Sequence, residues 1–367
     1  GRWASRVRGL PEFSSELPAS ALAEEIETPG AGQIRALFTV AGNPVLSTPN
    51  GRRLERALPA LELMVSLDLY RNETTRHAHF LLPTTPPLQR DHYDLVFHAL
   101  AVHDTARYSA PLRDPDPGLR HDWQVLDGLA RRLDRGRFAR RLGRRLMAAL
   151  GPRRQLALAL RRGPLGAGFV PFRRGLTLAR LERQPHGVDL GPHPPCLPQR
   201  LRTADRRIDL APALFVADVE RLQARLTSTA AARPDELLLL GRRHLQSNNS
   251  WMHNVPRLMR GRERCTLLMH PDDARRRGLQ DGCLVEIVSR TGTVRAPLAV
   301  SDEMRPGVVS LPHGWGHHRP DTQLATASRQ PGASLNDLTD EKRVDALSGN
   351  AALSGVPVTV TAVAAPR

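Results

Sequence analysis

Two runs of hydrogen-bonding residues, each placed directly after an apolar segment, constrain this chain most strongly. The first, GRRHLQSNNSWMHN, spans residues 241–254, and the second, LPHGWG, spans residues 311–316. Side chains that donate and accept hydrogen bonds at this density do not suit a hydrophobic core, so both runs are predicted to be surface loops. Loops of this composition favour a binding site for a large, flat and polar ligand.

The first part of the chain alternates apolar, β-rich runs with helical patterns. Strands are predicted in IRALFTVAGNP (residues 34–44), LELMVSLDLY (61–70) and HFLLP (79–83), and helices over residues 17–27 and 51–58. This alternation is typical of a parallel α/β sheet. In such sheets ligands bind beyond the carboxyl ends of the strands, where the GNP, Asp68 and NETT segments lie.

The middle of the chain has a different character. From Trp123 to Leu150 apolar residues recur at helical spacing with arginine between them, which predicts an amphipathic helix. The Arg-rich stretch 131–162 is interpreted as a solvated face, with a membrane-surface or partner-docking face as the alternative. Residues 163–212 are rich in Gly and Pro and are predicted to be a loop or linker. Metal ligation by His186 and His193 is the alternative to ordinary loop histidines.

A domain boundary is predicted at Ala231–Pro234, because short β-rich runs separated by turn signals follow it. This pattern predicts a closed or nearly closed β-barrel with one short helix, whose N-cap is His270-Pro271-Asp272. The predicted organisation is therefore an α/β part over residues 1–120, a helical and Pro/Gly-rich connecting region over 121–232, and a barrel over 233–367.

Composition argues against nucleic-acid binding in spite of a formal charge of +16. Of 53 basic residues only Lys342 is lysine, and the arginines are spread over the chain, which indicates GC-rich codon usage. A phosphate-binding surface would show clustered basic stripes with aromatic platforms, whereas aromatic residues make up only 4% of this chain.

Three cysteines stand far apart without a CxxC pair, which argues against a disulfide framework and against an iron–sulfur or zinc site. We expect free thiols in a cytoplasmic protein, with Cys196 the one in exposed surroundings. No apolar stretch of about 18 residues occurs, so no transmembrane segment is expected. The first residues hold neither an initiator Met nor a signal-peptide core, which indicates a chain that begins inside a longer protein.

The order of motifs resembles the C-terminal portion of the molybdopterin oxidoreductase family, which includes dimethyl sulfoxide reductase, formate dehydrogenases and nitrate reductases. The motifs are GNP, an Asp after the second strand, NETT, the Asn-rich loop, HPDDARRRG, HGWG and SLNDLT. Individually they are weak, but their order and spacing cover almost the whole chain. The resemblance implies a Rossmann-like partial parallel sheet followed by a C-terminal double-psi β-barrel.

The resemblance also implies a cofactor, bis(molybdopterin guanine dinucleotide) with molybdenum, or with tungsten instead. Residues at the sheet would hold a nucleotide, with Asp68 on the guanine or its ribose; the barrel loops would line a pterin–diphosphate trough and cover a pterin edge. The implied cofactor-binding residues are Gly42, Asn43, Pro44, Asp68, Thr74, Thr75, Arg242, His244, Gln246, Asn248, Asn249, Ser250, Trp251, Met252, His313, Gly314, Trp315, Gly316 and Asn336.

Polar side chains suit a pterin, because Asn, Gln and Ser satisfy its alternating donors and acceptors without adding charge, and Arg suits diphosphate. Glycines at 314 and 316 are expected to let the backbone approach a flat ring. The alternative interpretation is that both loops are ordinary polar turns and that Asn248-Asn249 caps a helix.

The family's N-terminal part, with its [4Fe–4S] cysteines and molybdenum ligand, has no counterpart here, so the sequence indicates a fragment. It implies a formate-dehydrogenase-like enzyme partnered by its own N-terminal portion and an iron–sulfur electron-transfer subunit, with catalytic residues unknown and no protein ligand to the metal in this chain. Nitrate reduction and a non-redox hydration are the enzymatic alternatives. The non-enzymatic alternative is that this chain is a non-catalytic module that pairs with a separately encoded N-terminal chain. Such a module would show an exposed apolar face where its partner docks.

Overall fold

The computed structural model describes residues 2–134, 136, 138–166, 168–169, 175–227 and 235–363. The chain divides into two compact units, the first made of Gly1–Pro83 with Ala231–Arg367 and the second of Thr84–Ala230. The first unit therefore draws on both the first and the third of the predicted segments. The predicted boundary at Ala231–Pro234 lies outside the described residues.

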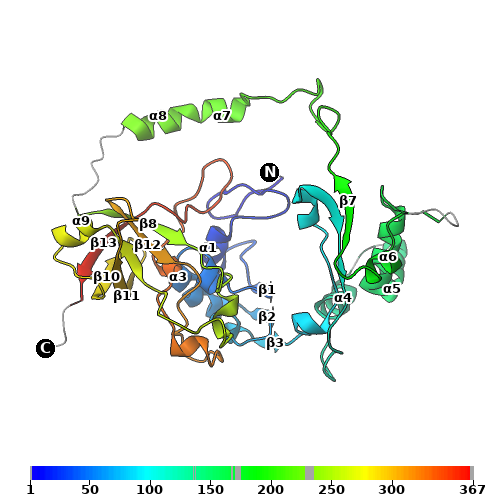
Figure 1. The fold of residues 1–367 in the computed structure, drawn as a ribbon, viewed down its shortest axis with the longest axis horizontal. Coiled ribbons are helices and arrows are strands. Elements are labelled where there is room, and N and C mark those ends of the chain that lie inside the picture. Colours follow the sequence, from blue (N-terminus) through cyan, green and yellow to red (C-terminus); the bar gives the residue numbers. More distant parts are fainter. Residues whose placement is uncertain are drawn as a thin grey trace. The chain divides into compact units, whose positions relative to one another are not determined.

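The first unit opens with a small parallel sheet in which β2 lies between β1 and β3 (Figure 1). Its three strands occupy the three segments that the apolar runs predicted. Leu37 and Met64 point to one face of the sheet and join a buried cluster with helical residues such as Ile26 and Leu54. The elements are β1 (Ala36–Val40), β2 (Leu63–Leu67), β3 (Phe80–Leu82), α1 (Leu22–Glu27), α2 (Pro44–Ser47) and α3 (Gly51–Ala57).

The C-terminal part of the first unit is a closed six-stranded barrel, which confirms the predicted barrel. Alternate residues of β8 show why it closes: Leu237 and Leu239 are buried in the barrel core, whereas Leu238 and Leu240 face outward. His270 caps the short helix as predicted, its ring accepting from the backbone N–H of Asp272. The elements are β8 (Leu237–Arg242), β9 (Leu267–Met269), α9 (Pro271–Arg276), β10 (Leu284–Val288), β11 (Thr293–Val300), β12 (Val308–Pro312) and β13 (Val356–Ala362).

The barrel strands run in order β10-β11-β9-β12-β8-β13 and include two parallel pairs, β8 with β12 and β9 with β11. In the first pair Gly241 lies opposite Leu311 and Arg242 opposite Pro312. Because parallel neighbours end at the same edge, the segments after β8 and β12 must leave the barrel side by side. These are the two polar runs of the sequence.

The second unit contains helices α4 (Asp122–Leu133) and α5 (Phe138–Arg162), which fall where the amphipathic pattern predicted helix. Gly151, with φ of 70°, breaks α5 ahead of Pro152. Exposed arginines here form ion pairs, as between Arg131 and Asp127. Two small antiparallel pairs complete the unit, from strands β4 (His92–Tyr93), β5 (His103–Ala106), β6 (Tyr108–Ser109) and β7 (Val188–Pro192).

The prediction that residues 163–212 form only loop or linker was wrong. Helix α6 (Leu178–Glu182) and strand β7 lie in this stretch, and Leu178, Leu181 and Val188 are buried with Tyr108 in a core cluster of the second unit. Gly and Pro flank these short elements, and their frequency in the sequence led to the prediction of a loop. Two further helices, α7 (Ala213–Ala217) and α8 (Val219–Thr227), contain no buried residue.

In the described part of the chain, no helix is both long and apolar enough to cross a membrane. The three cysteines are free thiols, and Cys196 is exposed as the sequence indicated, while Cys265 is buried.

Candidate functional site

The two polar runs interlock where they leave the barrel. The backbone N–H of His313 donates to the carbonyl of Arg242 at 2.9 Å. A Cβ on Gly314, whose φ is 91°, would lie 2.0 Å from the carbonyl oxygen of Asn249, so only glycine allows this approach. A Cβ on Gly316 would meet Ser334 at 2.7 Å. Protein atoms occupy the space beside both glycines, so each lets its loop pack closely against another segment.

The run after β8 exposes hydrogen-bonding side chains to solvent. Gln246, Asn248 and Asn249 are exposed, and Trp251 is 57% exposed. Asn248 and Asn249 have positive φ angles of 39° and 60°, a conformation that asparagine tolerates. The residue that caps the following 3-10 helix is Ser250, and it does so without a side-chain bond. Helix capping therefore does not account for the two asparagines.

Arg242 and Arg243 play different parts. The guanidinium of Arg242 donates to the carbonyls of Ser310 at 2.5 Å and Thr266 at 2.7 Å, which ties β8 to β12 and to the residue before β9. Burial lowers the pKa of Arg242 to about 10. Arg243 is exposed and donates to the side-chain oxygen of Asn249. Of the two, Arg243 is the cation available to a ligand.

A buried chain of hydrogen bonds joins the parallel sheet to the barrel. The carboxylate of Glu73 accepts from Asn43 Nδ2 at 2.7 Å and contacts His317 Nδ1 at 2.8 Å. His317 Nε2 lies 2.6 Å from His253 Nδ1, and the His253 ring packs against Trp315 at 4.3 Å between centroids. All three ionisable side chains are at most 1% exposed. Burial raises the pKa of Glu73, but the contact with His317 and the hydrogen bond from Asn43 outweigh burial, so the pKa lies below its usual value.

Residues predicted at the carboxyl ends of the sheet bond mainly to each other. Thr74 Oγ1 donates to Asn43 Oδ1 at 2.7 Å, and Thr75 Oγ1 donates to the carbonyl of Tyr70 at 2.9 Å. The carboxylate of Asp68 accepts from Asn72 Nδ2 at 3.0 Å and from two following backbone N–H groups. Gly42 is half-buried before Asn43, and Pro44 is the first residue of α2.

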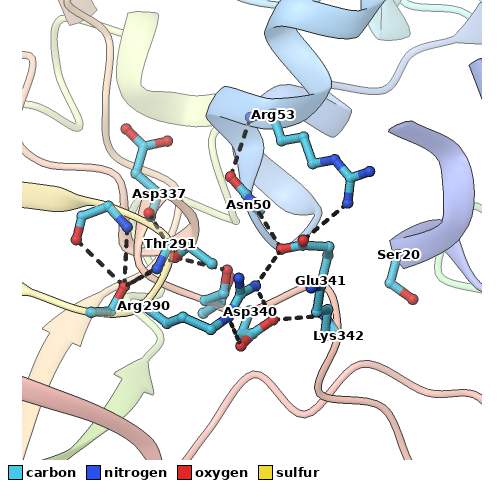
Figure 2. A network of polar contacts seen from close by, with 12 residues as sticks. Ser20, Asn50, Arg53, Arg290, Thr291, Asp337, Asp340, Glu341 and Lys342 are labelled. Carbon is cyan, nitrogen blue, oxygen red and sulfur yellow. Dashed lines mark hydrogen bonds and ion pairs between the residues drawn. The ribbon is translucent and has the colours of Figure 1, made fainter. Parts of the chain in front are cut away.

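Asn336 lies in a buried segment of the barrel that packs on the sheet domain. Its Nδ2 donates to the carbonyl of Leu46 at 2.7 Å and its Oδ1 accepts from Thr339, so it anchors α2. Figure 2 shows the acidic end of this segment, where Glu341 accepts from Asn50 at 2.8 Å and from Arg53 at 3.0 Å. These bonds fix the sheet against the barrel within the first unit.

Three histidines at the two polar runs have lowered pKa values, chiefly because they are buried. Burial and the charge of Arg243 lower the pKa of His313 to about 4. Burial, together with His317 and Arg264, lowers the pKa of His253 to about 3, and burial with Arg242 and Arg264 lowers that of His244. At pH 7 the three rings are neutral, so the positive charge of this region comes from arginine. The exposed Arg243 is the charge that could attract an anionic ligand here.

Four buried polar atoms in the two runs or directly against them have no hydrogen-bond partner in the protein: His244 Nδ1, His253 Nε2, Trp315 Nε1 and Ser334 Oγ, the last from the segment that packs on Gly316. Buried polar groups in proteins are almost always satisfied, so these atoms indicate a ligand or water at the loops. Trp315 Nε1 can only donate, whereas the histidine nitrogens and the serine hydroxyl can donate or accept, and a pterin edge presents both kinds of partner. Within the described ranges, no three His, Cys, Asp or Glu residues gather to hold a metal. A surface hollow of about 520 Å³ lies elsewhere and is lined by Asp272, Arg275 and Arg276 on α9.

Sequence reasoning missed Glu73, His253, His317 and Arg243. Each stands inside or directly beside a motif that was singled out, within NETT, WMHN, HGWGH and GRR. A carboxylate and two histidines next to glycine-rich or amide-rich turns were a signal for a buried polar network. The contact between Glu73 and His317, however, joins residues more than 240 positions apart, and local sequence patterns do not show such a contact.

His253 makes the first unit sensitive to acid. Its pKa in the folded protein is about 3, whereas an unfolded histidine titrates near ~6.5. Between these values the unfolded chain binds more protons, so this contribution to stability is complete above pH 6.5 and is lost as the pH falls towards 3. Between pH 6.5 and 5 the free energy of unfolding of the parent chain should fall by about 2 kcal/mol more than that of the His253→Gln variant. Urea unfolding of both proteins at the two pH values measures this difference. Equal losses in the two proteins would contradict this assignment.

Comparison with known proteins agrees with this geometry. Residues 237–357 match the model of the molydopterin dinucleotide binding domain. The assimilatory nitrate reductase catalytic subunit of Bacillus subtilis is 23% identical over 90% of this chain and 44% of its own length. The F420-dependent formate dehydrogenase subunit alpha of Methanocaldococcus jannaschii is 24% identical over 80% of this chain and 40% of its own.

A solved structure, acetylene hydratase from Pelobacter acetylenicus, superimposes with a TM-score of 0.70 at 16% identity. It covers 95% of this chain and 47% of that protein, which shows a shared fold. The chain thus spans less than half the length of these relatives. The molydopterin dinucleotide match coincides with the barrel and its two polar runs. The barrel thus matches a molydopterin dinucleotide binding domain, and the chain is similar over most of its length to molybdopterin oxidoreductases, among them nitrate reductase, formate dehydrogenase and dimethyl sulfoxide reductase subunits.

Proposed function

We propose that the polar runs after β8 and β12 bind the pterin and diphosphate of molybdopterin guanine dinucleotide, for a molybdenum oxidoreductase. One observation carries this: paired parallel strands bring the two runs to one end of the barrel, where they interlock. The run after β8 exposes a cluster of amide side chains there, whereas residues 311–316, which were predicted to be a surface loop, are buried beneath it. The match to the molydopterin dinucleotide binding domain over the same residues supports it. The double-psi connection of the barrel and the Rossmann-like character of the sheet are part of this proposal.

Different side chains would contact the pterin and the diphosphate. Gln246, Asn248 and Asn249 offer both donors and acceptors to a pterin, and Arg243 offers a guanidinium to diphosphate. Trp315, His253 and Ser334 would present their unpartnered polar atoms to the ring edge from below the loop surface. When bound, the metal of the cofactor supplies two-electron Mo(VI)/Mo(IV) chemistry, and the chain orients the pterin and holds its hydrogen bonds.

The proposal also assigns nucleotide binding to the carboxyl ends of the parallel strands. Asp68 is half-buried, and burial raises its pKa although three donors bond to it. We place it against the guanine or ribose of a dinucleotide, because ligands bind at the carboxyl ends of parallel strands. Asn43 and Thr74 would hold this end of the sheet in place and would not contact the ligand. Asn43 is hydrogen-bonded to Glu73, and Thr74 is hydrogen-bonded to Asn43.

For the whole enzyme we propose a formate-dehydrogenase-like activity in the cytoplasm, with electrons passed to iron–sulfur centres outside this chain. Nitrate reduction is the second candidate, because the matched nitrate reductase subunit is as similar over a larger share of this chain. Formate-dependent dye reduction and nitrite formation, assayed on the enzyme isolated from its own host, separate the two. Tungsten in place of molybdenum is distinguished by elemental mass spectrometry of the same sample.

Cofactor analysis tests the binding role. The protein is isolated from a host that makes the cofactor, and molybdenum or tungsten and GMP released by acid are measured. We expect about two GMP per metal for the bis-dinucleotide form. Arg243→Ala combined with Asn249→Ala should reduce GMP content about tenfold, since charge-assisted hydrogen bonds contribute roughly 1.5–3 kcal/mol.

Arg295→Ala serves as the matched control. Arg295 is an exposed barrel arginine paired with Glu286, away from both polar runs in the sequence, and its loss should leave GMP content unchanged. If the double variant retains as much GMP as this control, the polar run after β8 does not bind the dinucleotide. Protein that carries no GMP when isolated as the intact enzyme would overturn the proposal altogether.

A further inference from the structure

The second unit contains a strongly basic stretch of the chain. Residues 135–181 include thirteen arginines and no Asp or Glu, whereas the rest of the chain holds 37 acidic residues. Codon usage accounts for arginine but not for this local absence of carboxylates. Helix α5 lies in the stretch, and Gly151, with φ of 70° and ψ of 161°, divides the helix in two. We call residues 138–150, the part before this break, the basic helix.

The two parts of α5 differ in how they pack. After the break, Leu160 is buried in the core cluster of the second unit and Leu156 packs against it. Before the break, none of residues 142–150, whose side chains the structure describes, is buried. Leu142, Leu146 and Met147 are 46%, 61% and 47% exposed. A helix this short gains most of its stability by packing its apolar face, so this bare face is an interaction surface.

Apolar and basic side chains lie on different sides of the basic helix. Leu142, Leu146 and Leu150 recur at every fourth position and therefore share one face. At about 100° per residue, Arg144 lies opposite this face and Arg145 lies beside it. Within the described residues, Arg145 contacts no carboxylate. The basic helix thus combines an exposed apolar face with an unbalanced positive charge.

Helix α8 shows that exposed apolar side chains occur in this unit without such a charge. Leu222 and Leu226 are 52% and 76% exposed, and the helix contains no buried residue. Residues 218–227, however, hold two acidic residues and two arginines, so their charges balance. The positive charge is therefore what distinguishes the basic helix, and it requires an occupant that is both apolar and anionic.

We propose that the basic helix binds the surface of a membrane that contains anionic phospholipids. Helices that lie in a membrane surface carry Lys or Arg on the polar side and Leu or Phe on the other, and anionic headgroups attract the basic residues. Asp134, at the end of α4, pairs with Arg144 at 2.7 Å and so fixes the helix to the second unit. No residue of the polar runs takes part, so this inference is independent of the proposed function.

Other anionic partners fit the basic helix less well. A nucleic acid would engage the arginines but would leave the face of Leu142, Leu146 and Leu150 bare, and the aromatic platforms of single-strand binding proteins are missing from residues 142–150. An acidic groove on a protein would have to match both sides of the helix in shape. A fluid bilayer requires only that the apolar and basic sides are separate, which is the property observed.

Vesicle flotation tests the proposal. The intact enzyme from its own host is mixed with vesicles of phosphatidylcholine alone, or of phosphatidylcholine with an equal part of phosphatidylglycerol, and floated through a sucrose gradient. At ~0.1 M salt we expect at least tenfold more protein on the anionic vesicles, with most of it released at ~0.5 M salt. Leu142→Gln combined with Leu146→Gln should lower this binding at least tenfold, at exposed positions where glutamine preserves the helix.

Leu222→Gln combined with Leu226→Gln on α8 is the matched control, because it removes two exposed leucines at the same spacing and should float like the parent. Arg145→Gln leaves the apolar face intact and should lower binding to the anionic vesicles alone. Equal losses in the two double variants, equal flotation with both kinds of vesicle, or no flotation of the parent would overturn the proposal. Parent protein that does not float but retains duplex DNA or another polypeptide through the same leucines would identify that partner as the occupant instead.

Discussion

Replacing Glu73 by glutamine is expected to lower the free energy of unfolding of the first unit by about 3–5 kcal/mol. The carboxylate is fully buried and holds Asn43 Nδ2 at 2.7 Å and His317 Nδ1 at 2.8 Å. Glutamine has the same size, but its amide places N–H groups against one of these two donors. A buried group is then left unsatisfied where two segments of the first unit meet. Urea unfolding followed by the fluorescence of buried Trp315 measures the loss.

Glu62→Gln is the matched control for this change. Glu62 pairs with Arg35 at 3.0 Å, but both side chains are about two-thirds exposed, so we expect a loss of less than about 1 kcal/mol. The contrast isolates burial, because each variant replaces one ion-paired carboxylate, Glu73 being buried and Glu62 exposed. Equal unfolding midpoints for the two variants would show that Glu73 and His317 do not hold the sheet to the barrel.

Gly314→Ala is expected to separate the two polar runs and abolish cofactor retention. The new Cβ would lie 2.0 Å from the carbonyl oxygen of Asn249 and 3.0 Å from the backbone nitrogen of Ser250, and backbone atoms cannot rotate away. Overpacking of this kind costs roughly 3 kcal/mol, in addition to about 1 kcal/mol for a non-glycine residue at a φ of 91°. Unfolding midpoints and GMP content of the isolated protein report the two effects.

Gly307→Ala separates backbone strain from collision. Gly307 has a similar φ of 83°, but a Cβ there meets nothing within 4 Å. We expect this variant to lose only the strain contribution of about 1 kcal/mol and to retain its cofactor. If both glycine variants behave alike, the run after β12 does not pack against Asn249 as described.

Much of the first unit could be predicted locally. The strands at 36–40, 63–67 and 80–82 follow from apolar runs bounded by Gly, Asn and Pro, and the barrel strands follow from short β-rich runs with turn signals. The second unit was predicted less well. Strand β7 is only five residues long between Gly and Pro, and its partner β5 lies more than 80 residues away, so no local pattern revealed the pairing.

The sequence by itself determined which segments are loops with hydrogen-bonding side chains, because density of polar residues after an apolar strand is a local property. The sequence did not show which of these loops contact each other. The parallel pairing of β8 with β12 brings residues 241 and 311 together, and the Glu73–His317–His253 chain joins segments from both ends of the sequence. Contacts between distant segments depend on strand order and helix placement, which local composition does not encode.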